Sequence, residues 1–490
     1  MKRKLIENSL IYSGLQVLQG GVGFLLLPIY VRFLTPEDYG IVSVISSVVA
    51  FLGVFYLLGL NGAVYRYYFD FKDDPEQMKR FWGTVITFLL TLSFIFTLIL
   101  LFFGKFIFHL FLGNIEYYPY MFFGIIGAAF MPLFTIYQYL QQAQHEGRKY
   151  GIFRFSNFLV LSTLTIAFIV IFKLKAMGPI LAVTLTSGLF FIITLWNMRG
   201  KIIFGIDAKC LKKSLSYSLP IVPHTLTGWA AGLLDRLLIN RFVSTAAAGI
   251  YNVGYLFGGI QGFINSAVNQ AYTPWFFEEM KRNQTVKVKK FFILAMTLYI
   301  TLALWVTVFA KEALWIIAKG DFRESWKVVG LLSFGNFFGG YYFFLANQLF
   351  FSEKGIRFVP VATVSAAVFG FLLNLILIQK YGMMGAAITM FFTNLITTFL
   401  VGMFAQRIQP VDWDHLFIIR LVLINGAACI FAQYLSLVPM LSFSATFAMK
   451  TLVVMVCTYI NFRMCTERVG DSDILKKIFE LVKAKYSLAS

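Results

Sequence analysis

The chain has 490 residues, of which 59% are hydrophobic and only 13% are charged. Its mean hydropathy of +0.76 excludes an ordinary water-soluble globular protein. The net charge of +19 is spread over short loops rather than gathered in a folded basic domain. That distribution argues against a nucleic-acid partner.

Fourteen mostly apolar stretches follow one another along the chain. A helix of about 20 residues crosses a hydrocarbon core of about 30 Å, and stretches such as Trp82 to Phe103 are apolar on all sides rather than alternating. The sequence therefore predicts an all-α integral membrane protein. Its transmembrane helices are expected over residues 10–33, 38–61, 82–103, 118–140, 152–172, 177–198, 214–240, 246–272, 291–310, 326–349, 358–378, 382–405, 416–436 and 441–462.

The basic residues predict the orientation of these helices. If the N-terminus is cytoplasmic, the cytoplasmic segments hold 29 Lys or Arg residues and the opposite side holds 11. Short cytoplasmic loops carry such an excess of Lys and Arg. We therefore expect a multi-pass protein of the cell (cytoplasmic or inner) membrane with both termini in the cytoplasm.

Parts of the first half of the chain recur in the second half at offsets of 205 to 209 residues. Ser9, Leu10, Tyr12 and Ser13 match Ser214, Leu215, Tyr217 and Ser218; Arg32, Phe33, Gly40 and Ile41 match Arg241, Phe242, Gly249 and Ile250; Gly113, Gln141, Glu146, Met177 and Gly178 match Gly320, Gln348, Glu353, Met384 and Gly385. Each repeat holds six helices, so the copies should have the same orientation and be related by an axis along the membrane normal.

The repeat predicts three parts of the chain. They are an N-terminal lobe over 1–210, a C-terminal lobe over 211–406, and two extra helices with an amphipathic cytoplasmic tail over 407–490. The tail helix is expected over Asp471 to Tyr486, lying on the inner membrane surface. Two facing helical lobes are the usual architecture for alternating access. This organisation favours a transporter.

Three segments of the first lobe form a characteristic pattern. They read Asn8-Ser-Leu-Ile-Tyr-Ser13, Leu27-Pro-Ile-Tyr-Val-Arg-Phe-Leu-Thr-Pro-Glu-Asp-Tyr-Gly-Ile41 and Leu60-Asn-Gly-Ala-Val-Tyr-Arg-Tyr-Tyr-Phe69. They resemble the opening of the polysaccharide transporter family, the Wzx-type branch of the multidrug, oligosaccharidyl-lipid and polysaccharide (MOP) exporter superfamily. Pro220-Ile-Val-Pro-His224, followed by Asp235-Arg236, is similar to the start of that family's second lobe.

The resemblance implies a flippase. Such proteins move a polyprenyl-diphosphate-linked oligosaccharide or polysaccharide repeat unit from the cytoplasmic to the outer leaflet by alternating access. It also implies membrane lipid as a partner, a proton or sodium ion as a coupling ion, and a possible association with polysaccharide assembly proteins. Many members have twelve spans. The two extra spans expected here are shared by some branches, including the lipid II flippases.

Diphosphate-linked cargo needs cationic side chains near or inside the membrane. Arg66 and Arg154 lie at cytoplasmic helix ends and are candidates for a loading patch, although anchoring to lipid headgroups is the default interpretation of such residues. Arg236 is a candidate phosphate ligand within a span, and Asp235 is a candidate for ion coupling. An interlobe salt bridge is the alternative for both residues. His224, one turn beyond Pro220, is a candidate for a group that titrates near neutral pH, and a hydrogen bond between neighbouring helices is the alternative.

A polar stripe runs along the helix expected over 246–272. Gln261, Asn265 and Asn269 recur every four residues and therefore share one face. Their amides suit sugar hydroxyls, but they also suit hydrogen bonds to a neighbouring helix. Both interpretations stay open.

Other classes of function lack support in the sequence. No catalytic nucleophile with its base, no nucleotide-binding loop and no metal-ligand spacing is found, so we expect no enzymatic activity, cofactor or metal. A membrane-embedded polysaccharide polymerase or ligase is the less favoured alternative. A multidrug/cation antiporter of the same superfamily is the closer rival, but carboxylates are scarce within the expected spans, with Asp235 the main one.

Overall fold

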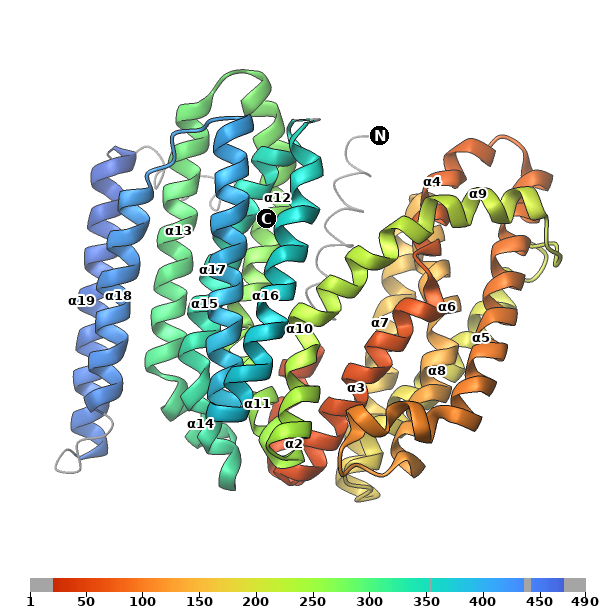
Figure 1. Cartoon of the computed structure of the whole chain (residues 1–490), viewed down its shortest axis with the longest axis horizontal. Coiled ribbons are helices and arrows are strands. Elements are labelled where there is room, and N and C mark those ends of the chain that lie inside the picture. Colours follow the sequence, from red (N-terminus) through yellow and green to blue (C-terminus); the bar gives the residue numbers. More distant parts are fainter. Residues whose placement is uncertain (1–20, 353, 436–441, 471–490) are drawn as a thin grey trace, which may run out of the picture. The chain divides into compact units, whose positions relative to one another are not determined.

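The computed structural model describes residues 21–352, 354–435 and 442–470, and these residues are almost entirely helical (Figure 1). Short 3₁₀ and π turns join or extend some of the helices. The helices are α2 (Val22–Phe33), α3 (Pro36–Leu57), α4 (Leu60–Phe71), α5 (Pro75–Leu112), α6 (Phe122–Ala143), α7 (Gly147–Ile166), α8 (Met177–Met198), α9 (Ala208–Ser218), α10 (Val222–Phe242), α11 (Thr245–Gly258), α12 (Ile260–Lys281), α13 (Thr285–Val308), α14 (Ala310–Ile317), α15 (Trp326–Phe350), α16 (Phe358–Tyr381), α17 (Met383–Ile408), α18 (His415–Leu435) and α19 (Phe443–Val469).

The predicted all-α membrane fold is confirmed. Eleven helical runs of the described residues are long and apolar enough to cross a membrane. Three expected spans are not among them. The span 10–33 is described only from residue 21, 214–240 is shared between α9 and α10 and contains charged residues, and 246–272 is divided between α11 and α12.

Side-chain caps fix where several helices begin. Thr35 and Asp38 form a capping box at the start of α3, and Asp74 accepts from the backbone N–H groups of Glu76 and Gln77 at the start of α5. At α9, Asp207 accepts from the N–H groups of Lys209 and Cys210, and these bonds hold the pKa of its carboxyl below the usual range. The capped α9 lies across the ends of its neighbours (Figure 1).

The helices form two compact units. Unit 1 comprises the described part of Met1–Phe257 together with Ala313–Val328 and Pro360–Thr393. Its core cluster joins α4, α5 and α6 through residues such as Leu60, Phe81 and Ile136. The helices α3 and α11 cross so closely that a Cβ added to Gly40 would lie 1.9 Å from the carbonyl oxygen of Thr245, and one added to Gly249 would lie 2.1 Å from that of Pro36. Only glycine fits at this crossing.

Unit 2 comprises Gly258–Glu312, Val329–Val359 and the described part of Asn394–Ser490. Its interior is rich in aromatic rings; Phe292, for example, lies 4.6 Å from Trp413 between ring centroids. The helices α18 and α19 are joined by a reciprocal amide pair, in which Asn425 and Asn461 donate to each other at 2.9 Å. Asn461 also donates to Thr301 of α13. These bonds satisfy amides that would otherwise be costly in hydrocarbon.

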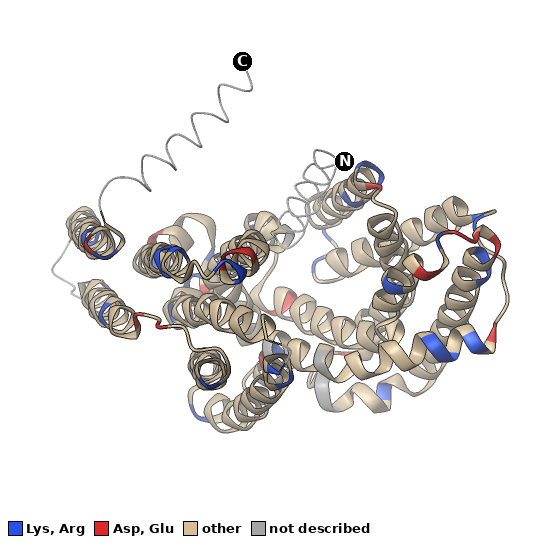
Figure 2. Ribbon diagram, turned by 90° about the horizontal axis from the view of Figure 1, so that it is seen from above, with Lys and Arg blue, Asp and Glu red and all other residues tan. Residues whose placement is uncertain are grey.

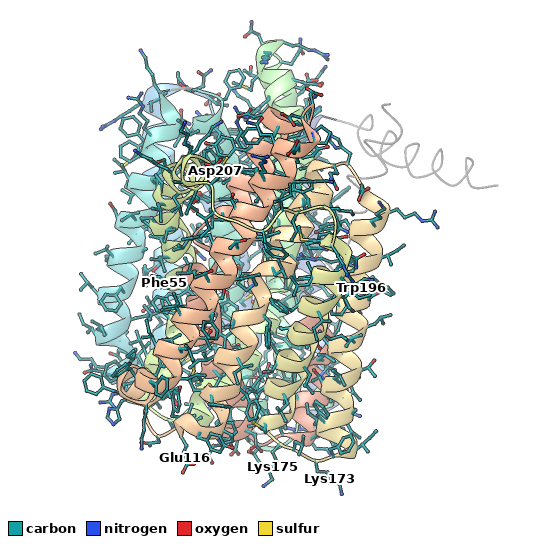
Figure 3. All side chains as sticks on the ribbon, turned by 90° about the vertical axis from the view of Figure 1, so that its right-hand side faces the viewer. Phe55, Glu116, Lys173, Lys175, Trp196 and Asp207 are labelled. Atoms are coloured by element: carbon teal, nitrogen blue, oxygen red, sulfur yellow. The ribbon has the colours of Figure 1, made fainter. Side chains whose placement is uncertain are left out.

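Charged residues lie mainly at helix ends and loops. Blue Lys and Arg segments mark several of the helix ends that face the viewer from above (Figure 2). Along unit 1, Glu116, Lys173 and Lys175 lie at the lower edge, Asp207 lies near the upper end, and Phe55 lies between these levels (Figure 3). The two charged levels are at opposite ends of the helices, as transmembrane segments require.

The compact units group helices by contact, whereas the predicted lobes 1–210 and 211–406 follow the sequence repeat. The lobe boundaries and the separate segment 407–490 therefore stay a prediction. The amphipathic helix expected over Asp471 to Tyr486 lies outside the described residues.

Candidate functional site

Asp235 of α10 is a buried carboxylate held by neutral groups. Its side chain is 4% exposed. The hydroxyl of Tyr251, on α11, donates to Oδ2 at 2.7 Å, and the Nδ2 of Asn374, on α16, donates to Oδ1 at 2.7 Å. Three helices of unit 1 thus meet at this carboxylate.

Arg236 is buried beside it but does not form a salt bridge with Asp235 in the described structure. Adjacent residues point about 100° apart on a helix, and Arg236 turns instead to α11. Its Nε donates to Oδ1 of Asn252 at 2.8 Å, and its Cζ lies 4.1 Å from the ring centroid of Tyr255. Nη1 also donates to the carbonyl of Gly232, one turn earlier on α10. The guanidinium is therefore held by two neutral acceptors and an aromatic face.

The oxygen atoms around Asp235 could hold a small cation. Oδ1 of Asn374 is buried and has no hydrogen-bond partner within the described part of the chain. The Asp235 carboxylate and the Tyr251 hydroxyl are oxygen donors of the kind that hard cations prefer. No cluster of three or more His, Cys, Asp or Glu residues suited to a metal ion occurs among the described residues.

The end of α10 is fixed next to this cluster. Asn240 donates to the carbonyl of Leu112, the last residue of α5, and accepts from the hydroxyl of Thr245 at the start of α11. These bonds hold the turn between α10 and α11. They keep Tyr251, Asn252 and Tyr255 next to the charged side chains of Asp235 and Arg236.

Arg66 lies on α4 and is half-exposed. It forms a 2.8 Å salt bridge with Asp70, which also binds Lys213 of α9 at 3.2 Å. The ammonium of Lys213 lies 4.4 Å from the ring centroid of Tyr67. One carboxylate is thus shared by two cations, which leaves a net positive surface at this end of unit 1.

Arg154 lies on α7, where its guanidinium is 5.8 Å from the ring centroid of Tyr150. Its Nε is buried and has no hydrogen-bond partner among the described groups. Arg66 and Arg154 are on different helices and have different partners. His224 lies on α10, but its side chain is outside the described part of the structure.

The polar stripe on α12 faces α15 within unit 2. Gln261 accepts from Ser333 at 3.4 Å, Asn265 donates to the carbonyl of Asn336 at 2.7 Å, and Asn269 accepts from Asn347 at 2.8 Å. These contacts favour the helix-joining interpretation. Two polar atoms of the stripe, Nε2 of Gln261 and Oδ1 of Asn265, are buried and have no partner in the described structure.

Several residues of these sites were not among the sequence candidates. Tyr251, Asn252, Tyr255 and Asn374 surround Asp235 and Arg236, and Lys213 completes the Arg66 surface. The one sequence signal was the isolated Asn374 in an otherwise apolar span, because a lone amide in hydrocarbon needs a polar partner. The identity of that partner depends on helix packing.

A second buried charge pair lies in unit 2. Lys450 of α19 is 1% exposed and donates to Oε1 of Glu312, in α14, at 2.5 Å. It also donates to the carbonyl of Val308 at 3.3 Å. This pair ties α19 to the end of α13 and the start of α14.

Comparisons with known proteins place these features in a family context. A family model for polysaccharide biosynthesis proteins matches residues 5–280. The Lsg locus putative protein 1 of Haemophilus influenzae is 22% identical over 375 residues, which cover 75% of this chain and 90% of that protein. An uncharacterized membrane protein of the same organism is 24% identical over 361 residues, covering 71% of this chain and 85% of that protein.

Solved structures share the fold. The lipid II flippase MurJ in an inward closed conformation matches with a TM-score of 0.71 at 12% identity, covering 94% of this chain and 99% of that one. An inward-facing multidrug resistance MATE family transporter of the MOP superfamily matches with a TM-score of 0.59 at 15% identity, covering 79% and 94% of the two chains.

The family match spans more than half of the chain, and the fold is shared with solved transporters. The resemblance stated from the sequence is therefore confirmed at the level of the family: the protein belongs to the polysaccharide biosynthesis protein family, and it has the fold of the lipid II flippase MurJ and of MATE transporters.

Proposed function

We propose that the protein is a flippase that moves a polyprenyl-diphosphate-linked oligosaccharide or polysaccharide repeat unit from the cytoplasmic to the outer leaflet by alternating access. Family membership supports the glycan pathway. The observation that carries the proposal is the buried Arg236, which is held by neutral groups rather than by a carboxylate. A buried arginine that has no carboxylate partner is costly in a membrane protein, and such residues mark substrate pathways.

The contacts of Arg236 suit an exchangeable phosphate. A guanidinium binds phosphate through parallel, charge-assisted hydrogen bonds that are stronger than bonds to an amide or a carbonyl. When the diphosphate arrives, it can replace Asn252 and the Gly232 carbonyl as acceptor, because neither carries a charge that opposes the exchange. Tyr255 keeps the guanidinium plane in place during the exchange.

Asp235 is the proposed coupling site for a proton or a sodium ion. Its carboxylate lies on α10 next to Arg236, and the Tyr251 hydroxyl provides a further oxygen atom 2.7 Å from Oδ2. Occupation by a cation would neutralise Asp235 and change the field at the neighbouring Arg236. Ion binding and phosphate binding would then be linked through adjacent residues.

The surface formed by Arg66 and Lys213 is the proposed loading patch, with Arg154 as a further candidate cation on α7. Because Asp70 neutralises only one of the two cations it binds, the patch keeps positive charge for a diphosphate. Long, half-exposed side chains can reach a headgroup without leaving water.

The test is a leaflet-accessibility assay with the full chain in proteoliposomes and a polyprenyl-diphosphate-linked oligosaccharide as cargo. Arg236→Ala should slow flipping at least about tenfold, the effect of losing one strong charge-assisted contact. Arg420→Ala is the matched control, because Arg420 is an exposed arginine of the spanning helix α18. Normal flipping by Arg236→Ala would overturn this role.

The same vesicles distinguish the antiporter alternative. A flippase should not exchange a cationic dye for protons or sodium ions. A drug antiporter should do so, at a rate that depends on Asp235. Dye export that is abolished by Asp235→Asn, without any flipping of glycan lipid, would replace the proposed function with the antiporter.

A further inference from the structure

Two adjoining cavities in unit 2 have opposite chemical character. The first, of about 620 Å³, is lined by charged residues of three segments, including Lys289, Lys290, Asp412, Asp414 and Arg468. The second, of about 700 Å³, is lined by apolar residues of α15, α17 and α18, including Leu345, Phe399, Met403, Ile419 and Leu423. His415 lines both cavities. The two cavities together therefore match an amphiphilic ligand, with its charged group in the first cavity and its apolar chain in the second.

The charged cavity has a surplus of one positive charge. Lys289 is paired with Asp412 at 2.7 Å, and Arg468 is paired with Asp414. Lys290 forms no ion pair among the described residues, and its ammonium lies 3.9 Å from the Cβ position of Gly470. When His415 is neutral, a ligand with a single negative charge would neutralise the net charge of the residues that line this cavity.

The walls of the cavity are held in place by buried contacts. Trp413 is 2% exposed and donates to Gln348 at 2.9 Å, and its ring lies 4.6 Å from that of Phe292. Gln406 donates to the carbonyl of Val411 at 2.7 Å, which fixes the segment between α17 and α18. The hydroxyl of Tyr341 lies 2.6 Å from Nδ1 of His415, at the boundary of the two cavities.

The apolar groove opens toward the hydrocarbon. Phe399, Ile419 and Leu423 on its walls are more than half exposed, and in a bilayer these side chains would face acyl chains. Gly402 leaves space at the bottom of the groove, since a Cβ at this position would already lie 3.3 Å from Leu345. Its volume falls within the range of pockets that bind small molecules.

We propose that this pair of cavities binds one mono-anionic phospholipid of the surrounding leaflet as a resident lipid. Its phosphate lies at Lys290, within the field of Lys289 and Arg468, and an acyl chain follows the groove along α17 and α18. The site belongs to unit 2 and is separate from Asp235 and Arg236, so it does not depend on the proposed function. The occupant is a membrane lipid and is not carried across.

The experiment measures lipid binding by the purified full chain in detergent. Phosphatidylglycerol and phosphatidylcholine with identical acyl chains are titrated, and native mass spectrometry and the melting temperature report binding. Phosphatidylglycerol should bind about fivefold more tightly, the factor expected for one lysine at a membrane surface. Equal binding of the two lipids would overturn the proposal.

Two variants test the two cavities separately. Lys290→Gln should lower the affinity for phosphatidylglycerol about fivefold without changing that for phosphatidylcholine, whereas Lys281→Gln, at an exposed lysine outside the cavity, should change neither. Met403→Trp should fill the groove and weaken the binding of both lipids. Met455→Trp, on the exposed surface of α19, should leave the binding of both unchanged. Unchanged binding by Lys290→Gln or by Met403→Trp would refute the site. Equal stabilisation by free glycerol phosphate would show a soluble-anion site instead and would also refute it.

Discussion

Two of the buried charge sites in the described part of this protein are built differently. In unit 2, Lys450 and Glu312 neutralise each other directly at 2.5 Å. In unit 1, Asp235 and Arg236 are neighbours in the sequence, yet each is held by hydroxyl, amide or aromatic groups of other helices. The first arrangement satisfies its charges with each other, whereas the second leaves them available to ions that arrive from outside.

This difference suggests how structure and transport are divided. A direct ion pair in a low-dielectric interior is hard to open, because separating it exposes two charges to an apolar medium. A charge held by neutral dipoles can exchange those dipoles for a ligand of opposite charge. We therefore expect the pair in unit 2 to matter for stability and the cluster in unit 1 to matter for transport. The predictions below begin with the largest expected effect.

Removing Lys450 should have the largest effect on stability. Lys450→Ala leaves Glu312 buried without its partner, which should cost about 3 to 5 kcal/mol of folding free energy. The combined change Lys450→Met with Glu312→Leu should recover most of that loss, since it removes both charges. Thermal unfolding in detergent measures both effects. A melting temperature of Lys450→Ala equal to that of the unchanged protein would contradict the structural role.

Arg236→Lys should separate charge from geometry in the unit 1 cluster. Lysine keeps the positive charge but cannot bind phosphate through a planar fork. The flipping rate of Arg236→Lys should lie between the rates of the unchanged protein and of Arg236→Ala. Its melting temperature should fall by less than that of Lys450→Ala. If Arg236→Lys unfolds as readily as Lys450→Ala, then both charge sites are structural and the comparison fails.

Asp235→Asn should alter ion dependence rather than stability. The new amide oxygen can still accept from Tyr251, although the contact with Asn374 becomes weaker. Flipping should lose its response to a proton or sodium gradient, measured by imposing each gradient in turn across proteoliposomes. A gradient response equal to that of the unchanged protein would remove Asp235 from coupling.

The polar stripe on α12 can be tested for its two interpretations, hydrogen bonding between helices and sugar binding. The coupling between Asn269 and Asn347 in a double-mutant cycle should be about 0.6 to 1.7 kcal/mol, the range for hydrogen bonds between membrane helices. Flipping by Asn269→Ala should stay close to normal. A large loss of flipping without a change in melting temperature would instead support the sugar-binding interpretation of Gln261, Asn265 and Asn269.

The smallest effect on stability is expected at the exposed patch. Arg66→Ala removes a half-exposed salt bridge, so stability should change by less than about 1 kcal/mol, while flipping should fall about fivefold if a headgroup cation is lost. Lys72→Ala is the matched control, because Lys72 is an exposed cation that follows the same helix. Equal rates for the two variants would assign Arg66 to anchoring alone.

The sequence was sufficient for the fold because membrane helices are specified by length and hydrophobicity. It also identified Asp235 and Arg236, since a charge within an apolar span is rare enough to stand out. It could not identify Tyr251, Asn252 or Asn374 as their partners, because those contacts depend on how α10, α11 and α16 pack. Lys450 was visible as a charge in a span, but its role required the position of Glu312.

The contact between Gly40 and Gly249 bears on the predicted repeat. The repeat predicts these two glycines to be counterparts, and the structure brings them against each other with no room for a side chain. In a symmetric pair, a residue on the two-fold axis touches its own copy. If the predicted repeat holds, an axis that relates its copies passes through this crossing, and a side chain at either glycine would push both copies apart.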